Sequence, residues 1–135
     1  MRKRNESKHG SVSLFMPGTG RFDGVVEGHP DYVLAPTVAA WSGGAAPGAL
    51  DESWWFYGQA RKRPACPAVI EGLTLRGVRP GSTITIEGQR YECIDGGDVE
   101  LSFQFPGTYD VMVTRWPYLD GRYIVENPPQ AKQPR

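Results

Sequence analysis

Histidine and cysteine side chains can bind metals or take part in catalysis, and the chain contains two of each. A zinc site needs several converging nitrogen or sulfur ligands, whereas His9 and His29 stand far apart and the cysteines form no Cys-x-x-Cys pair. A nucleophilic cysteine needs a base beside it, and His29 with Asp31 is the only set on offer. Cys66 lies between two prolines and Cys93 lies in an alternating segment. We therefore expect both to be small buried side chains in a reducing cytosol, with a disulfide between them as the alternative.

Carboxylates and glycines at close spacing suggest ion or nucleotide binding. Asp95 and Asp98 could approach a calcium ion, but the long calcium loop with its terminal glutamate is missing, and Asp-Gly is typical of a hairpin turn. Asp51 and Glu52 are adjacent, so they cannot be assumed to flank a substrate. The glycines of residues 18–24 lack the helix and the Lys-Ser/Thr of a phosphate-binding loop. We therefore expect no enzymatic activity, no metal and no cofactor.

A dense aromatic run at residues 53–57, followed by basic residues, is the strongest candidate for binding. Adjacent side chains of a strand face opposite ways, so Trp54 and Phe56 share one face while Trp55 and Tyr57 share the other. One face can fill a core, and the other can meet a partner, because Trp, Tyr and Arg dominate interface hot spots. Alternatively, both faces are buried within the chain, or the aromatic rings stack on sugars. The candidate interface residues are Trp41, Trp54, Trp55, Tyr57, Arg61 and Arg63.

Charge and hydropathy argue against two classes of partner. The formal net charge is zero, with 15 basic and 15 acidic residues, whereas a nucleic-acid-binding protein normally carries a basic excess. The basic clusters at residues 2–4 and 61–63 are interpreted as a solvated terminus and a solvated loop. No apolar run approaches the ~20 residues that cross a bilayer, and no apolar region follows the basic N-terminus as in a secretory signal. We expect neither nucleic acid nor membrane as a partner.

The whole chain is rich in glycine and proline, with 17 and 12 residues, which favours short strands joined by tight turns. Strands are expected at residues 11–16, 21–28 and 53–57, of which the first two form a β-hairpin. Residues 31–41 hold two short apolar pieces separated by Pro36, and no capped helix of useful length is expected. The small residues at 42–48 predict a loop, and the basic, proline-bounded connector at 58–67 predicts a boundary.

The second half alternates more clearly between apolar and polar residues. Strands are expected at residues 82–86, 90–94, 99–105, 109–114 and 122–126, and the apolar residues at every second position of 99–105 give the strongest period. Tyr109 stands where the tyrosine corner of an immunoglobulin-like domain ties the preceding loop by its hydroxyl. About 60 residues are few for a complete seven-stranded domain, so we expect strands from the first half to complete the sandwich.

These elements predict an all-β fold, with an antiparallel immunoglobulin-like sandwich preceded by an N-terminal β-hairpin region. A flexible basic arm is expected at 1–10, the β-hairpin and aromatic strand region at 11–63, the sandwich at 64–127 and a C-terminal tail at 128–135. Whether the two halves form one sandwich or two small units stays open at this point.

Two short motifs in the second half are distinctive. They are Pro106-Gly107-Thr108-Tyr109, which leads into a strand, and Trp116-Pro117-Tyr118-Leu119, which forms a turn. Weaker similarity covers Phe15 to Val26 and Trp54 to Gly72. Over most of residues 12–126, the chain resembles small tail-associated virion proteins of tailed bacteriophages. The corner and turn residues of the motifs are Gly107, Tyr109, Trp116 and Pro117.

The resemblance implies a non-enzymatic structural protein of the virion, assembled in the host cytoplasm and associated with the tail or a tail fibre. Its partners would be other virion proteins in a symmetric multi-copy assembly. Two alternatives stay open. One is a host-surface carbohydrate-binding or adhesion module whose tryptophans stack on sugar rings, and the other is a capsid decoration protein.

Overall fold

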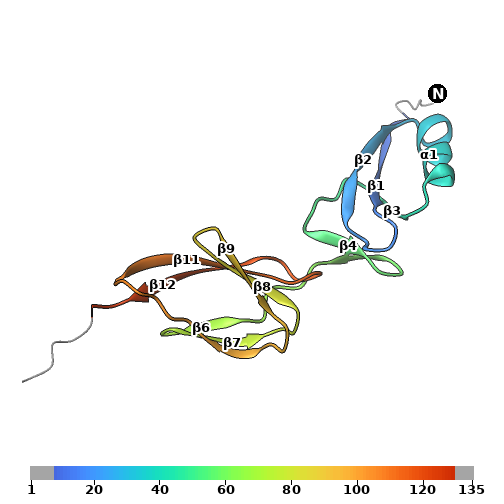
Figure 1. The fold of residues 1–135 in the computed structure, drawn as a ribbon. Coiled ribbons are helices and arrows are strands. Elements are labelled where there is room, and N and C mark those ends of the chain that lie inside the picture. The colour runs from blue at the N-terminus through green and yellow to red at the C-terminus, as the bar shows by residue number, and fades with distance from the viewer. Residues whose placement is uncertain (1–7, 130–135) are drawn as a thin grey trace, which may run out of the picture. The chain divides into compact units, whose positions relative to one another are not determined.

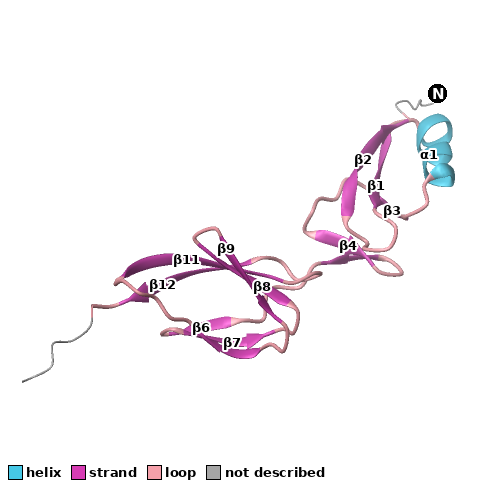
Figure 2. Cartoon of the chain, viewed as in Figure 1, coloured by secondary structure: helices cyan, strands magenta, loops and turns pink. Residues whose placement is uncertain are grey.

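The computed structural model describes residues 8–129, and its chain divides into two compact units between Arg63 and Pro64. Antiparallel strands dominate both units, and one short helical segment lies in the first (Figures 1 and 2). The all-β fold expected from the sequence is confirmed. Most of the arm expected at 1–10 and of the tail expected at 128–135 lies outside the described residues, although Gly10 already begins a strand.

The first unit is built on a three-stranded antiparallel sheet of order β2-β1-β3. Its strands are β1 (Gly10–Phe15), β2 (Phe22–Gly28) and β3 (Gly44–Pro47). β1 and β2 form the expected hairpin, and Gly18 and Gly20 in its turn have positive φ values of 86° and 76°. The expectation of a loop at 42–48 is wrong, because residues 44–47 pair with β1 as the third strand.

The small residues of β3 meet a packing requirement that cannot be recognised from the alternation of apolar and polar residues. The ring of Phe56 lies directly over Gly44, where an added Cβ would overlap it. That ring packs against the fully buried Phe15, with 5.7 Å between ring centroids, and Phe22 meets Phe15 edge-on at 5.8 Å. The Gly-Ala composition, which argued against a strand, therefore makes room for aromatic rings.

A helical segment joins β2 to β3, and it corrects the expectation of two separate apolar pieces. The π-helical turn η1 (Pro30–Leu34) continues directly into α1 (Ala35–Ala40). His29 caps the segment, because its Nδ1 accepts hydrogen bonds from the backbone N–H groups of Asp31 (3.0 Å) and Tyr32 (3.4 Å). Histidine is not among the favoured capping residues, which explains why the pattern hides this start.

A two-stranded hairpin completes the first unit. It comprises β4 (Trp54–Phe56) and β5 (Ala60–Lys62), which pair antiparallel. The connector expected at 58–67 therefore contains a strand in its first half.

The described part of the second unit, residues 64–129, contains seven strands in two sheets, of orders β10-β7-β6 and β12-β11-β8-β9. The strands are β6 (Val69–Glu71), β7 (Thr74–Val78), β8 (Ser82–Ile86), β9 (Gln89–Cys93), β10 (Gly97–Glu100), β11 (Gly107–Thr114) and β12 (Gly121–Asn127). The order is that of an immunoglobulin-like sandwich, with the fifth strand beside the second and the sixth between the third and the seventh. The expectation that strands of the first half complete this sandwich is wrong, because short strands fit all seven into this length.

The core of the sandwich comes from alternate positions of facing strands. Its buried members are Ala68, Leu75, Val78, Ile84, Leu101, Val111, Val113 and Val125. Residues two apart in a strand point to the same face, so the valines of β11 all reach this interior. The alternation that predicted strands in this half therefore also predicted the side that is buried.

The tyrosine corner expected at Tyr109 is present. Its hydroxyl donates a 2.6 Å hydrogen bond to the carbonyl of Phe105, and its ring stacks on Phe103 at 4.0 Å. Asn127 Nδ2 donates to the same carbonyl at 2.8 Å. These side chains occupy the Phe105 carbonyl, which a neighbouring strand would otherwise need as an acceptor. The strand expected at 99–105 is therefore wrong beyond Glu100, and the Phe105 side chain is 63% exposed.

Both cysteines are free and half-buried, so the disulfide left open by the sequence does not form. Each packs against the sandwich core. The Tyr123 hydroxyl donates to the carbonyl of Ala68 at 2.6 Å and lies 3.4 Å from the Cys66 sulfur. Burial, followed by the contacts with Cys66, raises the pKa of Tyr123 well above its usual 10.0.

Replacing Gly44 with alanine is expected to cost about 1–3 kcal/mol of unfolding free energy, because the new methyl group must displace the Phe56 ring. Urea unfolding followed by tryptophan fluorescence measures this, since Trp41, Trp54 and Trp55 all lie in the first unit. Ser42→Ala, at an exposed neighbouring position, is the control and should stay within about 0.5 kcal/mol of the parent. Equal stability of the two variants would contradict the packing assigned to Gly44.

Stability should fall as the pH rises above the ordinary tyrosine pKa of 10.0, because the unfolded chain then loses the Tyr123 proton while the folded chain keeps it. Below that pH both states hold the proton, and the contribution is fully present. Unfolding by urea at about pH 8 and about pH 11 measures the fall. Tyr123→Phe should reduce it, whereas Tyr91→Phe, at a half-exposed ring, should not. A fall of the same size in all three proteins would rule out Tyr123 as its source.

Candidate interface on the β4–β5 hairpin

The β4–β5 hairpin holds most of the aromatic and basic residues singled out in the sequence. Its register pairs Trp54 with Lys62, Trp55 with Arg61, and Phe56 with Ala60. Cross-strand partners in an antiparallel pair share a face. Trp55 and Arg61 therefore lie on one side of the ribbon, and the residues on either side of Trp55 lie on the other.

One side of the hairpin is committed to the first unit. Phe56 packs on Phe15, and its backbone N–H donates a 3.0 Å hydrogen bond to the carbonyl of Gly20. Gly20 is buried, and an added Cβ there would collide with the Phe56 backbone. The tight β1–β2 turn and the hairpin therefore hold each other through backbone contact.

The other side forms a stacked ladder, which we call the aromatic ladder and define as Trp55, Tyr57 and Arg61. The rings of Trp55 and Tyr57 are nearly parallel, with centroids 5.5 Å apart and an interplanar angle of 22°. The Arg61 guanidinium carbon lies 5.9 Å from the Tyr57 centroid, and Arg61 Nε donates to the Tyr57 carbonyl at 3.0 Å. Tyr57 remains 68% exposed. Intramolecular contacts thus pre-order large side chains that still face solvent.

The remaining candidate interface residues lie elsewhere or have structural contacts. Trp54 lies on the opposite side of the ribbon from the ladder, under the Lys62 ammonium at 5.6 Å. Trp41 lies at the end of α1, where its Nε1–H donates to the Phe15 carbonyl at 2.9 Å. Arg63 Nη1 donates to the Glu52 carbonyl at 3.1 Å, which ties β5 to the segment before β4. The structure therefore brings three of the six together.

Electrostatics favour anionic groups beside the ladder. Arg61, Lys62 and Arg63 follow one another in β5 and at its end, and Arg21 bridges to Trp55 through the backbone. Asp51 and Glu52 are acidic residues just before β4, and hydrogen bonds from the side chain and backbone of Ser53 lower the pKa of Asp51. Aromatic rings beside fixed cations are groups that can bind a partner.

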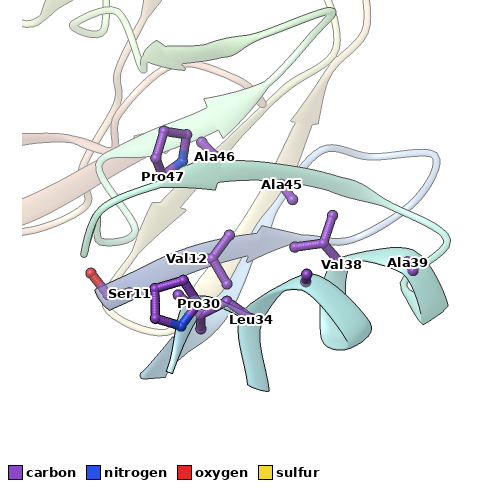
Figure 3. Close-up of a pocket in the computed structure, with 10 residues that line it drawn as sticks. Ser11, Val12, Pro30, Leu34, Val38, Ala39, Ala45, Ala46 and Pro47 are labelled. Atoms are coloured by element: carbon purple, nitrogen blue, oxygen red, sulfur yellow. The ribbon is translucent and has the colours of Figure 1, made fainter. Parts of the chain in front are cut away.

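A second surface feature, which was not predicted from the sequence, is an apolar groove of about 550 Å³ between the helical segment and strands β1 and β3. Figure 3 shows Leu34 and Val38 on the helical wall, with Val12, Ala45 and Ala46 on the sheet wall. One feature of the sequence does indicate this apolar surface. Residues 32–50 contain no charged residue, although 22% of the chain is charged.

Other residues weighed for chemistry have structural contacts instead. Asp98 pairs with Arg76 at 2.8 Å, and Arg76 also pairs with Glu71, which links β10, β7 and β6. His29 is the helix cap, and His9 lies 3.5 Å from Glu27. Within residues 8–129 no three side chains of His, Cys, Asp or Glu are grouped closely enough to hold a metal ion. None of the helices described there is long and apolar enough to span a bilayer.

The two sides of β4 should respond differently to truncation. Phe56→Ala is expected to cost about 3 kcal/mol, because it empties the space over Phe15 and Gly44. Tyr57→Ala should cost less than about 1 kcal/mol, because that ring faces solvent. Urea unfolding of the full chain compares the two variants directly. A loss at Tyr57 as large as that at Phe56 would show that the ladder serves the fold.

No protein-family model, curated protein or solved structure matches this chain.

Proposed function

We propose that this chain is a non-enzymatic structural protein of a tailed-phage virion, associated with the tail or a tail fibre and acting through protein–protein contacts. The observation that carries the proposal is the aromatic ladder, in which Trp55, Tyr57 and Arg61 contact one another while Tyr57 and Arg61 are exposed and Trp55 is half-buried. These are the residue types that dominate interface hot spots. Because intramolecular contacts already order them, binding costs less side-chain entropy.

The motifs of the family resemblance support the tail assignment. Pro106-Gly107-Thr108-Tyr109 leads into β11 and supplies the tyrosine corner, so this motif is a folding element of the sandwich. Trp116-Pro117-Tyr118-Leu119 forms the β11–β12 turn, where the Leu119 N–H donates to the Pro64 carbonyl at 2.7 Å. Both motifs shape the second unit as a scaffold, which agrees with a structural rather than a catalytic role.

The basic residues beside the ladder indicate the chemistry of the partner. A cationic hairpin with exposed rings suits a neighbouring virion protein that presents carboxylates and an apolar contact. Steering between opposite charges speeds such encounters, and desolvated ring contacts then supply most of the affinity. Assembly through this hairpin should therefore weaken with added salt without being abolished.

Purified particles of the phage that encodes this chain provide the test, after separation into heads and tails. We expect an antibody against the recombinant chain to detect it in the tail fraction. Detection in heads alone would instead favour a capsid decoration protein. Absence from particles, together with binding of a host-surface glycan that Trp55→Ala abolishes, would favour a carbohydrate-binding module. Either of these results overturns the proposal.

The ladder is tested by complementation of a phage that lacks the gene. Combined Trp55→Ala and Tyr57→Ala substitutions should lower incorporation into tails at least about tenfold, because hot-spot truncations each cost about 2 kcal/mol or more. Tyr91→Ala, at a half-exposed ring of the second unit, is the matched control and should assemble normally. Normal incorporation of the double variant would remove the ladder from the assembly contact.

A further inference from the structure

Strand β9 (Gln89–Cys93) is an open edge of the sandwich in the second unit. It is the last strand of the sheet β12-β11-β8-β9, so β8 pairs with only one of its sides. Proteins often protect such an edge with a lysine, a proline or a bulge. β9 contains neither of these residues, and it pairs with β8 without a shift of register. This edge can therefore accept another strand.

The turn before β9 determines which of its backbone groups point to β8. Glu87 and Gly88 form a two-residue turn with positive φ values of 49° and 84°, as in a type I′ hairpin turn. The residues that flank such a turn, here Ile86 and Gln89, form a hydrogen-bonded pair. Bonded and non-bonded pairs alternate along an antiparallel ladder. The backbone N–H and C=O groups of Gln89, and of every second residue after it, therefore point to β8.

The residues between them present their backbone groups to the open edge. Cys93 agrees with the alternation, because its carbonyl accepts a 2.8 Å hydrogen bond from the Gly81 N–H on the side of β8. The N–H and C=O groups of Arg90 and Glu92 therefore point away from β8. The side chains of these two residues are exposed on one face of the sheet. Neither forms an ion pair within residues 8–129.

We propose that a second copy of this chain pairs with this edge, β9 against β9, antiparallel and about a twofold axis through residue 91. In this register Arg90 of each copy lies directly opposite Glu92 of the other copy. The same two residues supply the outward backbone donors and acceptors, so both cross-strand pairs combine hydrogen bonds with opposite charges. A twofold contact pairs one patch with itself, and β9 is complementary to itself in both respects.

Charge and backbone direction select this register over its neighbours. An axis through Arg90 would set two arginines opposite each other, and an axis through Glu92 would set two glutamates opposite each other. Like charges directly opposite destabilise a strand pair. An axis between two residues would set outward backbone groups against groups that point to β8, so no ladder could form. Charge complementarity therefore selects a second copy of the chain in one register.

The other edges described in the second unit are shorter, irregular or partly covered. The segment before β6 lies against the beginning of β12, where the Leu119 N–H donates to the Pro64 carbonyl and an added Cβ on Gly121 would overlap the Cys66 sulfur. β10 pairs with β7 through a shift of register, and β6 has only three residues. β9 is therefore the edge best suited to pairing.

Sedimentation equilibrium of the purified full chain tests the pairing. We expect a dimer, and Arg90→Glu should raise its Kd at least about fivefold, because both symmetric pairs change from attraction to repulsion. Glu92→Arg should do the same. Combining Arg90→Glu with Glu92→Arg exchanges the two charges and should restore the Kd of the parent chain. Circular dichroism shows whether each variant is folded.

Arg122→Glu is the matched control, because it makes the same change of charge at an exposed residue of β12 in the same sheet. It should leave the Kd unchanged. The chain is tested without other virion proteins, so the outcome is independent of the function proposed above.

Four results would overturn the proposal. The first is a parent chain that stays monomeric up to about 100 μM, which excludes even a weak dimer. The second is a dimer whose Kd is unaffected by both single variants, which places the contact elsewhere. The third is a combined variant that pairs no better than the single variants, because Arg90 and Glu92 would then not face each other. The fourth is an assembly larger than a dimer that the single variants dissolve, because a twofold contact closes on itself.

Discussion

The packing of the Phe56 ring on Phe15 and over the bare backbone of Gly44 is the contact on which the first unit depends. It joins the β4–β5 hairpin to the three-stranded sheet and requires glycine at position 44 of β3. Because adjacent residues of a strand face opposite ways, packing Phe56 against Phe15 places Trp55 and Tyr57 on the other side of the hairpin. The aromatic ladder is therefore a consequence of how this core is closed.

The second unit is stabilised by a core between two sheets. Its two sheets bury one continuous apolar cluster, and side chains rather than strands satisfy the backbone where β10 ends. Tyr109 and Asn127 both donate to the Phe105 carbonyl, which fixes the chain where it crosses from one sheet to the other. The second unit therefore completes its own interior with its own strands.

The first unit, by contrast, leaves two kinds of surface exposed. The aromatic ladder combines rings with cations, whereas the groove and helical segment are uncharged. The two surfaces therefore differ in chemistry although they belong to the same unit.

Local alternation was enough to predict much of this protein. The β1–β2 hairpin, strands β8, β9, β11 and β12, the opposite faces of Trp54 and Trp55, and the corner at Tyr109 all follow from period-two patterns and turn residues. These features depend on residues close together in the chain, so a sequence contains their causes.

Tertiary contacts decided the rest. Residues 44–47 are a strand because they pair with β1, and the Phe56 ring lies over Gly44 there. Strand β10 ends at Glu100, and the Phe105 carbonyl accepts hydrogen bonds from Tyr109 and Asn127. The helical segment depends on an unusual histidine cap, and the groove exists only where that segment meets β1 and β3. The sequence by itself thus determined the β-rich class and the facing of individual strands. Only the tertiary structure decided which small or apolar segments pair, cap or stay open, because those outcomes depend on side chains far apart along the chain.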